Sequence, residues 1–111
     1  MSVTAAAKAL ILQSVIEKSI DNIDVLSLSN SSGEIFRIVP QKKETISSKE
    51  RKYAFYLTEN EAVDTIVKMS LYGNGATVSL GTGTEMTAQA VNIVKTNTQS
   101  LLIHWTVRVV E

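Results

Sequence analysis

The chain has 111 residues, no cysteine and a formal net charge of zero, with 44% hydrophobic and 20% charged residues. This length predicts a single domain over residues 1–111, and the composition argues against disorder. Zero net charge argues against a general nucleic-acid binder, which needs a basic excess, and the lack of cysteine excludes disulfides and thiolate metal sites.

The N-terminal part of the chain does not read as a membrane segment or a signal peptide. Its longest apolar stretch, residues 9–16, is broken by Gln13 and Ser14 and is far shorter than a membrane span. The first positive charge, Lys8, follows three alanines instead of preceding an apolar run. We therefore expect no membrane partner and folding in the compartment of synthesis.

The first expected element is a helix within residues 1–20. Residues 3–19 are rich in good helix formers, and Thr4 or Ser2 can serve as the N-cap. Two apolar stripes run along this helix, the first formed by Ala7, Leu10, Ile11 and Val15 and the second by Leu12, Ile16 and Ile20. A helix resting on one sheet face needs only one stripe. Either the helix is sunk deep in its own domain, or the second stripe meets another subunit.

Residues 23–111 are expected to be mainly antiparallel β-structure. Alternation of apolar and polar residues predicts strands at 23–29, 34–39, 52–57, 65–72, 76–80, 84–94 and 100–110. Asn74-Gly75 predicts a tight hairpin turn, and a slip of the alternation near Val91 predicts a bulge. The polar stretch 41–52 is interpreted as a solvated loop with the beginning of a strand. The predicted fold is α+β, an N-terminal helix packed on an antiparallel β-sandwich of about six or seven strands.

Few groups in the sequence are suited to chemistry. His104 is the only histidine, and an enzyme built on it needs a carboxylate and a nucleophile within hydrogen-bond reach. The acidic residues Glu59, Glu61 and Asp64 lack the ligand number, spacing and glycine of a calcium loop. We therefore predict no catalytic residues, no cofactor and no bound metal, so the chain is not expected to be an enzyme.

Two tyrosines, Tyr56 and Tyr72, fall on outward positions of predicted strands and are available to a ligand or another subunit. The residues expected at a partner interface are accordingly Leu12, Ile16, Ile20, Tyr56 and Tyr72. Unpaired strand edges are further candidates. An alternative function is a carbohydrate- or receptor-binding β-sandwich module with Tyr56 or Tyr72 in a concave exposed site.

The second half of the chain contains three consecutive stretches of a recognisable kind: residues 66–73 (IVKMSLYG), 83–91 (GTEMTAQAV) and 95–109 (KTNTQSLLIHWTVRV). Their order resembles bacteriophage tail proteins of the fibre-attachment, collar and baseplate type, most clearly from Thr65 onward. The early Gly-Thr-Gly of that family is replaced here by residues 29–33.

This resemblance implies a non-enzymatic structural component of a phage tail. It implies location in the virion tail after synthesis in the cytoplasm of the bacterial host. It further implies a symmetric homo-oligomer that holds other tail proteins by docking and strand addition, with no nucleic acid or membrane as partner.

Overall fold

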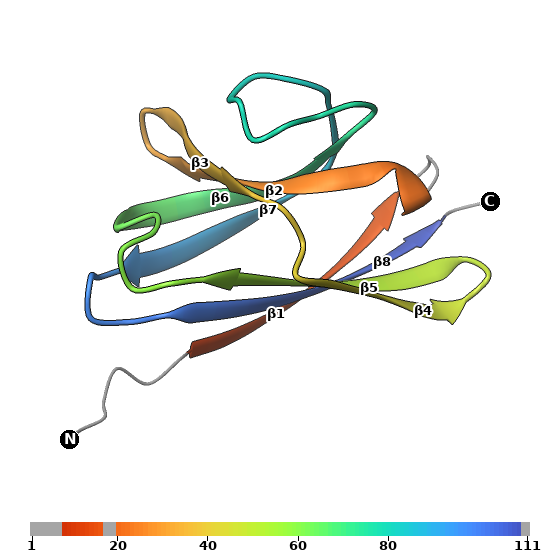
Figure 1. Ribbon diagram of the computed structural model, residues 1–111, viewed down its shortest axis with the longest axis horizontal. Helices are drawn as coiled ribbons and strands as arrows, with labels where there is room; N and C mark the ends of the chain where they lie inside the picture. Colours follow the sequence, from red (N-terminus) through yellow and green to blue (C-terminus); the bar gives the residue numbers. More distant parts are fainter. Residues whose placement is uncertain (1–7, 17–19, 110–111) are drawn as a thin grey trace.

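The computed structural model describes residues 8–16 and 20–109, and these residues form a β-sandwich of two four-stranded sheets (Figure 1). Sheet A has the order β1-β8-β5-β4, and sheet B has the order β3-β2-β6-β7. The strands are β1 (Lys8–Ile16), β2 (Ile23–Asn30), β3 (Gly33–Ile38), β4 (Lys42–Ser47), β5 (Glu50–Leu57), β6 (Asp64–Gly73), β7 (Thr84–Lys95) and β8 (Leu101–Val109), with one short 3-10 turn, η1 (Ile20–Asn22). All paired strands are antiparallel except β1 and β8, which are parallel.

The predicted N-terminal helix is wrong, and with it the α+β fold class, because the described residues are almost entirely β. Residues 8–16 of the expected helix form β1, while residues 1–7 and 17–19 lie outside the described part of the chain. The first supposed helical stripe mixes the two faces of a strand, since Leu10 packs against the core, whereas the described residues of the second stripe share the inner face. Leu12 and Ile16 point into the core, and Ile11 and Val15 point to solvent. Helix propensities differ by at most about 0.7 kcal/mol per residue among ordinary residues, which is less than strand pairing and burial supply.

Most of the remaining strand predictions are confirmed. The strands expected at 23–29, 34–39, 52–57, 65–72, 84–94 and 100–110 correspond to β2, β3, β5, β6, β7 and β8. The bulge expected near Val91 is present, because Ile66 pairs with Ile93 whereas Lys68 pairs with Ala90. Two predictions are wrong: residues 42–47 of the expected loop form β4, and residues 76–80 belong to a loop instead of a strand.

The core lies between the two sheets and is closed on one side by β1. Its largest fully buried side chains are Trp105, Tyr53, Phe55, Leu26, Leu28, Leu57, Ile66, Met69, Leu71, Ile103, Val25 and Val107. The indole nitrogen of Trp105 donates a hydrogen bond to the Ser14 hydroxyl at 2.8 Å. A buried indole N–H requires such an acceptor, so this bond ties β1 to the centre of the sandwich.

Residues 74–83, the β6–β7 loop, fold back over the outer face of sheet B. Asn74 and Gly75 adopt positive φ, as the expected turn requires, but the chain does not return as a strand. The Asp24 carboxylate accepts hydrogen bonds from the backbone N–H groups of Gly75 and Ala76. The loop closes where a Cβ on Gly83 would lie 2.4 Å from the Ala76 Cβ, so only glycine fits there.

Candidate interaction surfaces

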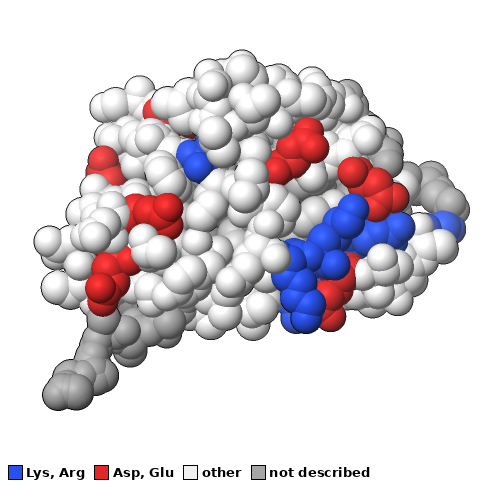
Figure 2. Space-filling view, viewed as in Figure 1, with Lys and Arg blue, Asp and Glu red and all other residues white. Residues whose placement is uncertain are grey.

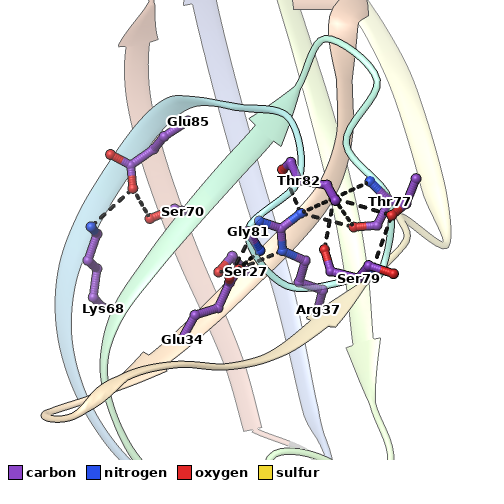
Figure 3. Close-up of polar contacts among 10 residues, drawn as sticks. All are labelled: Ser27, Glu34, Arg37, Lys68, Ser70, Thr77, Ser79, Gly81, Thr82 and Glu85. Atoms are coloured by element: carbon purple, nitrogen blue, oxygen red, sulfur yellow. Dashed lines mark hydrogen bonds and ion pairs between the residues drawn. The ribbon is translucent and has the colours of Figure 1, made fainter.

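A buried arginine holds the β6–β7 loop on sheet B (Figure 3). The Arg37 side chain is completely buried, and its guanidinium donates to the Glu34 carboxylate at 2.6 Å. It also donates to the carbonyl oxygens of Thr77 and Thr82, at 3.0 and 2.8 Å, and to the Thr82 hydroxyl at 3.0 Å. These contacts join a strand to a loop about forty residues further along the chain.

The Glu34 carboxylate is the acceptor at the centre of this network. It accepts hydrogen bonds from Arg37, from the Ser27 hydroxyl and from the backbone N–H of Gly81. Partial burial of Glu34 raises its pKa, but the hydrogen bonds from Arg37, Ser27 and Gly81 outweigh that effect and hold the pKa below its ordinary value. The carboxylate is therefore ionised at neutral pH and stabilises the loop.

A second carboxylate on the same face behaves in the same way. Glu85 accepts a hydrogen bond from the Ser70 hydroxyl at 2.7 Å and pairs with the Lys68 ammonium at 3.0 Å (Figure 3). Burial raises the pKa of Glu85, and the bonds from Ser70 and Lys68 lower it further than burial raises it. Both networks connect neighbouring segments of the fold.

The two tyrosines of the expected interface lie on different sheets and are not brought together. Tyr72 is half-buried on sheet B, where the Arg37 guanidinium carbon lies 4.3 Å from its ring centroid, the geometry of a cation–π contact. That ring face is occupied by the arginine. Tyr56 is 38% exposed on the outer face of sheet A, opposite Leu102 on β8.

The three residues expected to form an interface on a helix, Leu12, Ile16 and Ile20, do not lie on a common exposed surface. Leu12 and Ile16 are 8% and 2% exposed and belong to the core. Ile20 begins η1, and its side chain lies outside the described part of the structure.

Two large apolar residues of the first expected helical stripe, Ile11 and Val15, are exposed on β1. Ile11 is 71% exposed and Val15 is 52% exposed on the outward face of this strand. We call the outward residues Ile11, Gln13 and Val15 the β1 strip. Residues 10–16 show no alternation of apolar and polar residues, so no local signal in the sequence indicates this strip.

A second apolar surface, the β3 groove, lies beside the end of β3 and the β6–β7 loop. It is an open groove of about 520 Å³ lined by Ile35, Phe36, Arg37, Ile38, Val39, Glu61, Val78 and Leu80. Val39, Val78 and Leu80 are each at least half exposed. The groove was not predictable from the sequence, because the pattern of residues 76–80 indicates a paired strand and not a loop.

Lysines and arginines gather in one patch over β4 and β5, on the right of Figure 2. Carboxylates lie among them and partly neutralise the patch. Asp21 pairs with Lys43 at 3.5 Å and with Arg51 at 3.2 Å, and Glu44 lies 3.8 Å from Lys42. The hydrogen bond from Arg51 is the largest cause of a lowered pKa at Asp21. The patch is therefore a solvent-exposed surface at the sheet edge, whose charges largely pair with one another.

The groups considered for chemistry are dispersed. His104 lies on the outer face of β8 opposite Ala54, and its Nδ1 has no hydrogen-bond partner among the described residues. The Glu61 carboxylate accepts the Thr58 N–H at 2.8 Å, and Asp64 accepts from the Asn30 amide at 3.0 Å. Residues 8–16 and 20–109 contain no cluster of three or more potential metal ligands.

Comparison of the chain with protein-family models, with curated proteins and with solved structures gives no significant match. In the described part of the chain, no helix is long and apolar enough to cross a membrane.

Proposed function

We propose that this chain is a non-enzymatic structural component of a bacteriophage tail, which assembles with copies of itself and docks neighbouring tail proteins. The sequence resemblance supports the tail assignment. The three similar stretches fall on β6, on the start of β7, and on β8 with the turn that precedes it. They therefore supply one inner strand of each sheet, β8 and β6, together with the edge strand β7.

The observation that carries the assembly proposal is a pair of separate, exposed apolar surfaces on one small domain. The β1 strip lies on sheet A, and the β3 groove lies beside sheet B. Large exposed apolar patches mark interaction sites in soluble proteins. A domain with two of them can contact two different neighbours, which suits a link in a larger structure.

The polar networks support this proposal, because they fix the position of one of the two apolar surfaces. Arg37 and Glu34 hold the β6–β7 loop, so that Val78 and Leu80 keep a defined position beside β3. A preorganised surface loses less conformational entropy when a partner binds.

Light scattering over a concentration series tests the assembly proposal, and we expect the mass of a closed oligomer. A monomer at every concentration, with glycan binding that depends on Tyr56, would instead support the alternative carbohydrate- or receptor-binding module. The tail assignment is tested separately, since the protein must be present in purified tails of the phage that encodes it.

A further inference from the structure

The four edge strands of the sandwich differ in how well they are protected against pairing with another chain. Exposed edges are commonly blunted by charge, bulges, proline or short length. The β4 edge carries Lys42, Lys43 and Glu44 together with a register shift. The β3 edge is six residues long, has a register shift and is followed by Pro40, and β7 has two register shifts against β6.

The β1 edge has no proline and no register shift against β8, and its only charged residue is Lys8 at its first position. Its nine residues pair with β8 in one unbroken register, and within the described residues β8 is its only strand partner. Residues 9–16 contain no charge, no proline and no glycine. The other side of β1 therefore presents backbone N–H and C=O groups next to the exposed side chains of Ile11 and Val15.

We propose that β1 pairs antiparallel with β1 of a second copy of this chain, across a two-fold axis at Gln13, to form one continuous eight-stranded sheet. This inference rests on the proposed function and names the surface and the partner used in self-assembly. A two-fold axis makes the strand its own partner, so each unpaired backbone group of one copy meets one of the other.

The side chains select the register. With the axis at Gln13, Ile11 of one copy lies opposite Val15 of the other on the outer face, and the two Gln13 side chains face each other. On the inner face, Leu10 lies opposite Ile16, and Leu12 lies opposite Ser14. Each face thus has one kind of pair that is apolar on both strands, Ile11–Val15 outside and Leu10–Ile16 inside, and such pairs stabilise a strand pair.

An axis at Leu12 is less favourable. It places Ile11 opposite Gln13 and Leu10 opposite Ser14, so that apolar residues face polar ones on both sides of the sheet. The Gln13 register avoids both of these mixed pairs and leaves only Leu12 opposite Ser14. The absence of charge in residues 9–16 also means that self-pairing at Gln13 brings no like charges together in the strand.

Disulfide trapping in the full chain tests the proposal. The protein has no cysteine, so Gln13→Cys introduces a single thiol. Facing residues in an antiparallel pair have Cα atoms about 4.5–5.5 Å apart, within the range of a disulfide. We expect mild oxidation to convert Gln13→Cys largely into a covalent dimer.

The matched control is Ile46→Cys, on the opposite edge of the same sheet and 52% exposed like Val15. It is expected to stay monomeric on non-reducing gels. Mixed Ile11→Cys and Val15→Cys proteins should form the cross-linked heterodimer. Cross-linking of Ile11→Cys with Gln13→Cys instead, with none between Gln13→Cys copies, would overturn the register.

Light scattering of Ile11→Lys provides a second measurement. We expect its dimer dissociation constant to rise at least about 100-fold, because two apolar contacts are lost and two charges enter the interface. Ile46→Lys should leave the dissociation constant unchanged. If Ile11→Lys does not fold, the cysteine experiment alone decides.

The two proposals fail in different ways. An oligomeric wild type that Ile11→Lys leaves intact and Gln13→Cys does not cross-link would overturn the β1 pairing and leave the assembly function standing. A wild type that is monomeric at every concentration would overturn both self-assembly and the β1 pairing.

Discussion

Replacing Arg37 by methionine removes the guanidinium that holds the β6–β7 loop on sheet B while keeping a long apolar side chain. The Glu34 carboxylate then loses its buried cation, and the carbonyl oxygens of Thr77 and Thr82 lose a donor. Breaking a buried ion pair by removing one partner costs about 3–5 kcal/mol. Glu34 keeps 17% exposure of its side chain, so water can solvate it in part. We therefore expect a loss at the low end, about 3 kcal/mol, and a Tm about 12 °C lower.

Urea denaturation followed by fluorescence measures this loss, because Trp105 is the single, fully buried tryptophan. The control is Arg51→Met, whose partner Asp21 is 54% exposed, and we expect a much smaller loss there. Hydrogen exchange should accelerate in residues 76–83 of Arg37→Met and not in those of Arg51→Met. Equal losses in the two variants would refute the conclusion that Arg37 fastens the loop.

Three further outcomes are expected. Ser14→Ala leaves the Trp105 indole N–H without its acceptor and should cost about 1–3 kcal/mol in urea titrations, whereas an unchanged midpoint would show that the bond contributes nothing. Gly83→Ala should destabilise more than Gly81→Ala by differential scanning calorimetry, because both have positive φ but only the Cβ at 83 meets another Cβ at 2.4 Å. The folded-state pKa of Glu85 lies below its ordinary value of 4.5, so its stabilisation is present above that pH and is lost as the pH falls through the folded pKa. Glu85→Gln should therefore flatten the decline in unfolding free energy below about pH 4.5, and an unchanged slope would contradict this sign.

Strands with one buried face were predictable, because their apolar and polar residues alternate with a period of two. In β8, Leu101, Ile103, Trp105 and Val107 are all buried while the residues between them are more exposed. The register slip near Val91 was predictable for the same reason, since an inserted residue shifts every later side chain to the other face.

The β1 strand was not predictable from its own residues. Its apolar residues at 10–12, 15 and 16 do not alternate with polar ones but fit a helical period, and alanine and leucine favour the helix. The deciding interactions are the parallel pairing with β8 and the Trp105–Ser14 bond. Both depend on the far end of the chain.

The polar network around Arg37 was invisible for a different reason. Alternation along a strand predicts on which face of the sheet a residue lies, but it does not show which other segment covers that face. Arg37 falls on the outward parity of β3 and becomes buried only because the β6–β7 loop folds over it. An arginine between apolar neighbours, in Phe36-Arg37-Ile38, was the only local hint. The loop was predicted as a turn and a returning strand, because Asn-Gly normally forms the two-residue turn of a β-hairpin.

The pairing of β1 with β8 also constrains the order of folding. Ser14 and Trp105, which join these strands, are 91 residues apart. Contacts of such long sequence separation require the closure of a large loop and form slowly. During synthesis, β1 leaves the ribosome long before β8, so the rest of the sandwich can be in place before its first strand docks. We therefore expect the last step of folding to be the arrival of β1, and a slow kinetic phase that Ser14→Ala slows further would report it.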